Sequence, residues 1–208
     1  MGTDPILRSV ALVLALGLGA CAVPDDRAGR LILDPDAASQ AAEARQIAAL
    51  TQAFMALGPQ VDPAEAARAA RVSYEEVARL RGVYQITDGP LVHNAKVNMG
   101  LRPRGLCWHW AVDLGARLER EAFATLTVHQ AIANYDNLRL EHSTVILGAR
   151  GAPMQAGIVL DPWRAGGDLT WMPVREDTRY DWTARDEVFA WRRARGLAAP
   201  SYPKPLGG

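Results

Sequence analysis

The sequence predicts an α+β fold in which several helices precede an antiparallel sheet. Up to about Glu121, apolar residues recur with the three- to four-residue spacing of helices that pack one face on a core. From Ala124 the pattern changes to the alternation of strands, and short turns rather than helices separate them, as in a sheet of neighbouring antiparallel strands. With 208 residues, 49% of them hydrophobic, the chain can form one domain with a proper core.

The N-terminal segment has the features of an export signal. Val10–Leu18 is apolar throughout, too short to span a bilayer as a mature helix but typical in length of a secretory signal. Leu18-Gly19-Ala20-Cys21 then resembles the lipobox of bacterial lipoproteins, in which the cysteine is lipidated and becomes the first residue. This resemblance implies a signal peptide over residues 1–20, a lipid anchor such as palmitate on Cys21, and a tether over 21–36. An ordinary signal peptide cleaved nearby is the alternative.

The same resemblance carries an expectation about location. Ala22 rather than Asp follows Cys21, which resembles the outer-membrane sorting pattern of Gram-negative lipoproteins. We therefore expect a cell-envelope protein, held on the outer membrane and facing the periplasm.

The charge of the chain argues against nucleic acid as a partner. Lys and Arg total 23, Asp and Glu total 23, and the isoelectric point is about 6.9. Broad nucleic-acid surfaces need a basic excess, which this composition lacks. We predict no cofactor. We also predict no metal site, since no CxxC-type spacing is present.

Two helical regions precede the centre of the chain, and we assign packing roles to both. Residues 37–57 carry apolar side chains at helical spacing, and Gly58-Pro59 stops them. Asp62-Pro63-Ala64-Glu65 has a cap residue, Pro at the first helical position and Glu at the third, which indicates a second start. A further capping pattern at Ser73–Glu76 predicts a break near Val72, with the helix resuming to Leu80.

Cys107 is predicted to open the next helix, which runs to about Glu121 after an irregular approach over residues 91–104. The side chains in line with it along the helix form an apolar stripe, namely Trp110, Ala111, Leu114 and Leu118. His109 falls on the other side, on a predicted wet face with Asp113, Arg117 and Arg120, and is a poor partner for the sulfur. The helix N-terminus favours a thiolate at Cys107.

The number of cysteines in the chain indicates that Cys107 keeps a free thiol. With Cys21 blocked by lipid in an oxidising compartment, Cys107 has no disulfide partner. A free thiol there is either a small buried hydrophobe or a group that is used. A zinc site from Cys107, His109 and His142 is opposed by geometry, because helical residues two apart point away from each other.

Three predicted strands follow, over residues 124–134, 141–147 and 154–160. With a turn near Gly151, the pairing partners of His142 fall around Leu160 and Asp161, so the acid lies next to the imidazole. His129, which has no such acid, is interpreted as a sheet histidine. The sequence after Arg164 predicts a strand over 169–174, a closing helix over 183–195 and a disordered tail over 199–208.

The order Cys107, His142, Asp161, with Pro162-Trp163 after the acid, resembles the transglutaminase-like superfamily of papain-like fold. The resemblance covers residues 105–164 and implies a Cys-His-Asp triad within a single domain over 37–198. It also implies a thiol hydrolase of peptidase or amidase type, acting through a thioester on a peptide or protein substrate in the envelope.

Two asparagines that precede Cys107 in the chain are candidates for the second oxyanion donor that such chemistry needs. Asn94 and Asn98 could each supply it, although loop asparagines often serve only their own turn. Two other functions stay open: a non-catalytic binding or scaffold lipoprotein that retains the fold, and a cysteine amidase acting on cell-wall peptide.

Overall fold

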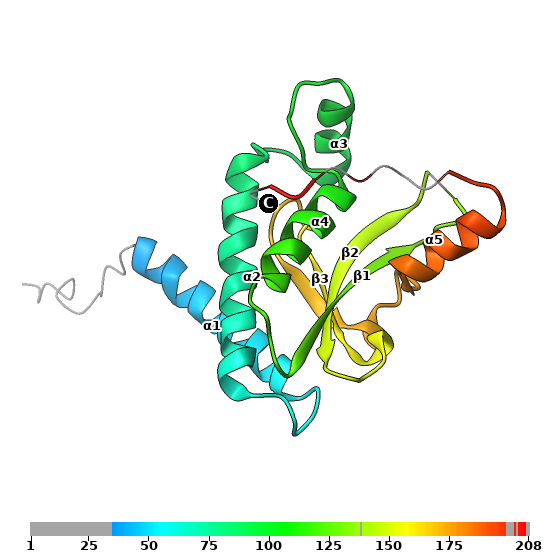
Figure 1. Cartoon of the computed structure of the whole chain (residues 1–208). Helices are drawn as coiled ribbons and strands as arrows, with labels where there is room; N and C mark the ends of the chain where they lie inside the picture. Colours follow the sequence, from blue (N-terminus) through cyan, green and yellow to red (C-terminus); the bar gives the residue numbers. More distant parts are fainter. Residues whose placement is uncertain (1–34, 138, 199–201, 203, 207–208) are drawn as a thin grey trace, which may run out of the picture.

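A computed structural model of the chain describes residues 35–137, 139–198, 202 and 204–206 (Figure 1). The predicted signal peptide, Cys21 and nearly all of the predicted tether lie outside these residues. Among the described residues, no helix has the length and apolar character needed to cross a membrane.

Five antiparallel strands form the sheet, in the spatial order β4-β3-β2-β1-β5. Their bounds are β1 Leu126–Ala133, β2 His142–Ala149, β3 Ile158–Asp161, β4 Thr170–Pro173 and β5 Thr183–Ala184. Helices come before the sheet and one closes it, so the predicted α+β class is confirmed. The helices are α1 Pro35–Met55, α2 Pro63–Val83, α3 Pro90–Asn98, α4 Cys107–Glu119 and α5 Arg185–Ala194.

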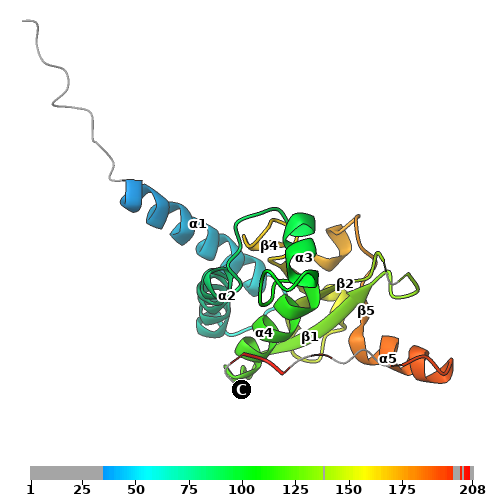
Figure 2. The ribbon, with the colours of Figure 1, turned by 90° about the horizontal axis from the view of Figure 1, so that it is seen from above.

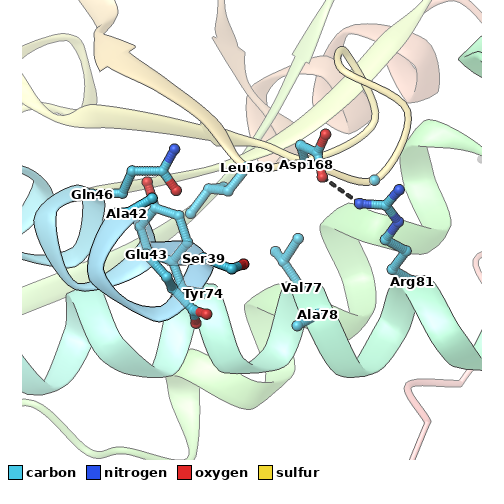
Figure 3. A pocket seen from close by; sticks show the side chains of 11 residues that line it. Ser39, Ala42, Glu43, Gln46, Tyr74, Val77, Ala78, Arg81, Asp168 and Leu169 are labelled. Carbon is cyan, nitrogen blue, oxygen red and sulfur yellow. Dashed lines mark hydrogen bonds and ion pairs between the residues drawn. The ribbon is translucent and has the colours of Figure 1, made fainter. Parts of the chain in front are cut away.

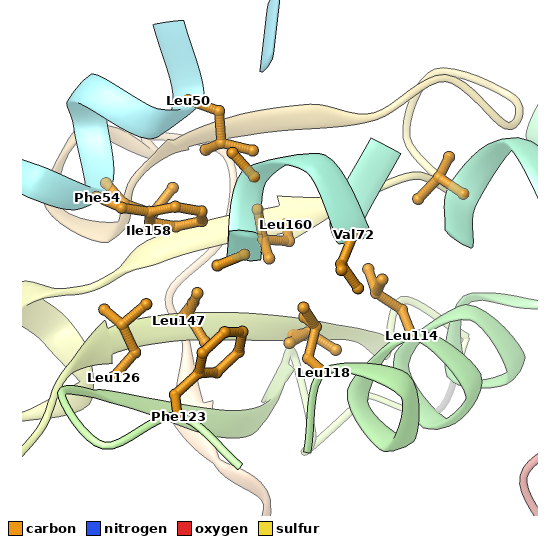
Figure 4. Packing of buried hydrophobic residues seen from close by; sticks show 14 of the residues in the cluster. Leu50, Phe54, Val72, Leu114, Leu118, Phe123, Leu126, Leu147, Ile158 and Leu160 are labelled. Atoms are coloured by element: carbon orange, nitrogen blue, oxygen red, sulfur yellow. The ribbon is translucent and has the colours of Figure 1, made fainter. Parts of the chain in front are cut away.

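The main core lies between the sheet and the three longest helices. Helices α2 and α4 lie over one face of the sheet (Figures 1 and 2), and their side chains meet those of β2 and β3, with the end of α1 closing the cluster (Figure 4). Fully buried members include Leu50, Phe54, Leu114, Leu118, Leu147 and Leu160. A smaller cluster covers the opposite face of the sheet, where Ile146 and Val159 pack beneath Trp182. The strands β2 and β3 are thus buried on both faces.

The predicted break in the second helix is wrong, whereas its predicted start is confirmed. Asp62 accepts a hydrogen bond from the Glu65 backbone N–H at 2.9 Å, as an N-cap does. Ser73 does not cap a new helix, because its hydroxyl donates to the Ala69 carbonyl at 2.7 Å in the buried middle of α2. The irregular approach predicted over 91–104 is also wrong in part, since α3 begins there with Pro90 in its first turn.

The strand register differs from the predicted one. Leu160 lies opposite Val145 rather than opposite His142. The reason is a short 3-10 turn at Met154–Ala156, which delays the start of β3 to Ile158. One residue further along, Asp161 falls diagonally beside His142 on the same face, still within reach of its ring.

Candidate functional site

The first turn of α4 is held by two of its own side chains. His109 Nδ1 accepts the backbone N–H groups of Gly105 at 3.2 Å and Leu106 at 3.1 Å. Trp110 Nε1 donates to the Gly105 carbonyl at 3.1 Å. Burial, with a contribution from Arg104, lowers the pKa of His109 to about 4, so the ring stays neutral and can accept. The prediction that His109 lies on a wet face is wrong.

The turn into α4 requires glycine at position 105. Gly105 has φ +126°, and a Cβ there would lie 2.3 Å from Nε2 of His93. His93 comes from the inner side of α3 and is buried, with Nε2 donating to the Arg104 carbonyl across 2.9 Å. The position of Cys107 two residues later therefore depends on a contact between α3 and α4 that the sequence analysis missed.

Asp113, predicted to be exposed, is instead a buried acceptor in the middle of α4. Its carboxylate accepts from the Tyr84 hydroxyl, from Arg104 at 2.9 Å and from the Leu206 backbone N–H at 2.8 Å. Burial and the hydrogen bond to Asp113 raise the pKa of Tyr84. Asp113 thus connects α2, α4 and the C-terminal segment, a structural role far from a solvated face.

The described residues of the C-terminal tail lie along α4. The Tyr202 ring stands edge-on to Trp108 at 5.8 Å between ring centres, and Leu206 packs on the main core. The prediction of a disordered tail does not hold for these two residues. Tyr202 therefore borders the end of α4 that carries Cys107.

His142 and Asp161 form a buried pair at the ends of β2 and β3. His142 Nε2 lies 2.7 Å from Asp161 Oδ2, and the two residues are 2% and 1% exposed. Such a contact fixes the ring orientation and leaves Nδ1 as the nitrogen free to exchange a proton. The adjacency predicted from the sequence is confirmed, although the register that produces it is different.

A second ion pair holds the carboxylate of Asp161. Arg164 donates to it from Nε at 3.1 Å and from its backbone N–H at 3.2 Å. The same guanidinium reaches Asp177 at 2.6 Å, and Asp177 also accepts from Trp182 Nε1 at 3.0 Å. These contacts tie the loop that follows β4 to the acid beside His142.

Aromatic rings enclose His142. The centres of Tyr180, Trp163 and Trp182 lie 4.6, 4.7 and 5.5 Å from the centre of the imidazole. Trp163 is held in turn by Asn94 on α3, whose Oδ1 accepts the indole N–H at 3.0 Å. Asn94 therefore keeps its amide N–H groups for another acceptor, whereas Asn98 is exposed at the end of α3.

Cys107 lies at the first position of α4, half-buried, beside this pair. Its sulfur is 4.0 Å from the carbonyl oxygen of Glu141, the residue before His142. Within the described chain, Nδ1 of His142 is buried without a hydrogen bond of ordinary geometry. Burial lowers the pKa of His142, but the hydrogen bond to Asp161 and the nearby Cys107 sulfur outweigh it and raise the pKa to about 9. The structure thus brings together the three residues predicted as a triad.

Elsewhere in the described structure, no pocket or cluster of side chains has the reactive groups of the Cys107 site. A pocket of about 510 Å³ lies between α1, α2 and the loop at Gly167, lined by Glu43, Gln46, Tyr74 and the Arg81–Asp168 ion pair (Figure 3). It contains neither Cys107 nor a histidine. Among the described residues, no three His, Cys, Asp or Glu side chains form a group suited to a metal ion. His129 lies on β1, where burial lowers its pKa.

Comparisons with protein-family models, with curated proteins and with solved structures give no match for this chain. The assignment of a function therefore rests on the residues and geometry of the Cys107 site.

Proposed function

We propose that the chain is a cysteine-dependent hydrolase of peptidase or amidase type, with Cys107 as nucleophile, His142 as base and Asp161 as the residue that orients His142. The observation that carries this proposal is the buried His142–Asp161 contact of 2.7 Å, with the second ring nitrogen unpartnered among the described residues and Cys107 beside the ring. A buried imidazole with one nitrogen fixed by a carboxylate and the other near a thiol is the arrangement of an activated nucleophile.

The reaction follows from which atom can hold the proton. The Cys107 thiol gives its proton to Nδ1 of His142, and the sulfur attacks the carbonyl carbon of an amide. His142 then delivers that proton to the leaving nitrogen as the carbon–nitrogen bond breaks, which leaves a thioester on Cys107. Water attacks the thioester, His142 accepts a proton from the water, and Cys107 leaves as a thiol when the proton returns to sulfur. Asp161 and the surrounding rings stabilise the imidazolium in each step.

Oxyanion stabilisation is assigned to the start of α4 and to α3. The backbone N–H of Cys107 belongs to the first turn of a helix, where N–H groups have no partner within the helix. Asn94 is the better candidate for the second donor, because Trp163 fixes its carbonyl oxygen and leaves its N–H groups available. The exposed Asn98 is the weaker candidate.

The cellular setting belongs to the same proposal. The Leu18–Cys21 motif supports a lipoprotein of the cell envelope, and the order of Cys107, His142 and Asp161 on a helix and two strands supports a transglutaminase-like domain. We propose a peptide or protein of the envelope as substrate and water as the acceptor.

Alkylation of Cys107 by iodoacetamide at pH 6, followed by mass spectrometry, tests the catalytic assignment. A free cysteine, with an ordinary pKa of about 8.5, is almost entirely protonated at that pH and reacts slowly. We expect Cys107 to react fast in the native protein and His142→Ala to slow the reaction at least tenfold, because the imidazolium that stabilises the thiolate is lost. Circular dichroism serves as the control for folding of the variant.

A matched control is His129→Ala, which removes a histidine of the same sheet with no described contact to Asp161. It should leave the alkylation rate unchanged. A native Cys107 that reacts only after unfolding would point to a buried hydrophobe and a scaffold protein instead. Equal rates in the native protein and in His142→Ala would also defeat the triad.

A further inference from the structure

Helix α3 is amphipathic, but its polar side is buried and its apolar side is exposed. Its buried side carries polar residues, since His93 is 1% exposed and Asn94 lies against Trp163. Its outer side carries large apolar residues. Leu91 is 74% exposed, Val92 54% and Met99 71%, and Leu101 in the following turn is 58% exposed. These four are half of the eight large hydrophobic side chains exposed among the described residues, so they form a cluster rather than a scatter.

The helical period places these residues together. At about 100° per residue, Leu91, Ala95 and Met99 fall on one side of the helix with Val92 at its edge, and His93 falls opposite them. Figure 1 shows α3 and the loop after it projecting beyond α2 and the sheet. We call the exposed side chains of Leu91, Val92, Met99 and Leu101 the α3 apolar face.

The segment that carries this face has an excess of positive charge, although Asp88 lies just before it. Residues 89–105 contain Lys96, Arg102 and Arg104 and no acidic residue, in a chain whose formal net charge is zero. Lys96 is paired with Asp88 at 2.6 Å, and Arg104 is paired with the buried Asp113. Arg102 contacts only backbone carbonyls among the described residues, those of Gln85 at 3.2 Å and Leu101 at 2.9 Å. A cation that makes no salt bridge among the described residues thus adjoins the apolar face.

We propose that the α3 apolar face is a membrane-contact surface, with Arg102 as its site for the phosphate of an anionic lipid. A short projecting element with apolar side chains and a flanking cation fits the boundary between headgroups and acyl chains. The sequence adds a second membrane signal, since the apolar run at Val10–Leu18 and the motif at Cys21 indicate a lipid anchor. Stable membrane attachment commonly takes two such signals. The proposal does not rest on the activity of Cys107.

The surface adjoins the candidate site. Asn94 of the same helix holds Trp163 against His142, and His93 packs under Gly105 just before Cys107. Contact of α3 with a bilayer would therefore place the Cys107 site next to the membrane surface.

A fluorescent label that reports local polarity tests the proposal on the full chain. With Cys21→Ser and Cys107→Ser removing the native thiols, Ala95→Cys carries the label NBD on the exposed side of α3, and Glu187→Cys carries it on α5 as the control. The probe is vesicles of phosphatidylcholine with phosphatidylglycerol. We expect the emission at position 95 to move to shorter wavelength with a several-fold rise in intensity, and the emission at position 187 to stay unchanged. The readout is local, so it does not depend on what else holds the chain to the vesicle.

Two sets of substitutions separate the apolar and the ionic contributions. Leu91→Ser with Val92→Ser and Met99→Ser should abolish the change at position 95, and folding of this variant is checked by circular dichroism. Arg102→Gln, a milder change, should weaken vesicle binding roughly five-fold, the equivalent of about 1 kcal/mol for one cation at an anionic surface. It should have no such effect with phosphatidylcholine alone.

No change at position 95, or the same change at positions 95 and 187, would overturn the proposal. A change that appears without vesicles and grows with protein concentration would overturn it too, because a second copy of the chain would then cover the face. A change produced only by an added apolar peptide would identify a peptide-binding surface in place of a membrane surface.

Discussion

Gly105→Ala should be among the most damaging single substitutions in the described part of the chain, because two separate effects act at that position. The backbone has φ +126°, a conformation that costs a non-glycine residue about 1–3 kcal/mol. The added Cβ would also lie 2.3 Å from Nε2 and 2.5 Å from Cδ2 of His93. Moving the buried His93 ring breaks its hydrogen bond to the Arg104 carbonyl, which adds about 1–3 kcal/mol for buried polar groups left unpaired. We therefore expect a loss of about 2–6 kcal/mol in the free energy of unfolding.

Urea unfolding followed by circular dichroism measures this loss, and the chain offers a matched control. Gly100, in the loop between α3 and α4, has φ +72° and nothing within 4 Å of an added Cβ. Gly100→Ala should therefore cost only the about 1–2 kcal/mol of a left-handed residue. In a His93→Ala background, Gly105→Ala should lose most of its excess over the control, because the obstructing ring is gone.

A Gly105→Ala variant no more destabilised than Gly100→Ala would refute a clash with the His93 ring. A full excess that persists without the His93 ring would refute it as well. In either case the contact between α3 and the start of α4 would not be what positions Cys107.

Cys21→Ser should abolish incorporation of labelled palmitate and lower the share of the protein in the membrane fraction, and persistent labelling would exclude Cys21 as the anchor. Arg164→Gln should lower the free energy of unfolding by about 3–5 kcal/mol in urea, because Asp161 and Asp177 would stay buried without their cation; a loss no larger than at an exposed arginine would argue against this network. The pKa of His109 is about 4 in the folded protein, lower than its ordinary value of 6.5. The neutral ring therefore contributes up to about 3 kcal/mol to the free energy of unfolding above pH 6.5, and this contribution is lost as the pH falls from 6.5 toward 4. His109→Gln, which can accept the same N–H groups without titrating, should remove that part of the acid sensitivity in unfolding measured from pH 7 to 4, and an unchanged acid sensitivity would contradict it.

The sequence was sufficient where a feature depends on neighbouring residues. Asp62 and Pro63 predict a helix start that needs only its own first turn, and the apolar stripe of Trp110, Leu114 and Leu118 predicts the buried side of α4. The same capping pattern failed at Ser73, because a hydroxyl inside a long helix can bond back to the preceding turn. Local patterns do not tell these two settings apart.

Errors arose where distant segments meet. Asp113 looks exposed on a helical wheel, but Tyr84 and Leu206 come from remote parts of the chain to cover it. The order of Cys107, His142 and Asp161 indicated the site. The register between β2 and β3 was wrong, because it depends on a 3-10 turn that has no clear sequence pattern. The bond from Arg164 to Asp177 likewise depends on a loop whose path no local pattern predicts.

Titration of the His142 ring by NMR measures whether one imidazole joins Asp161 to the Cys107 thiol. We expect a pKa of about 9 in the native protein, above the ordinary value of about 6.5. The pKa should fall both in Asp161→Asn and in Cys107→Ser, because each variant removes one group that favours the protonated ring. A ring that titrates near 6.5 in the native protein, with the same value in both variants, would show that neither Asp161 nor Cys107 acts on His142.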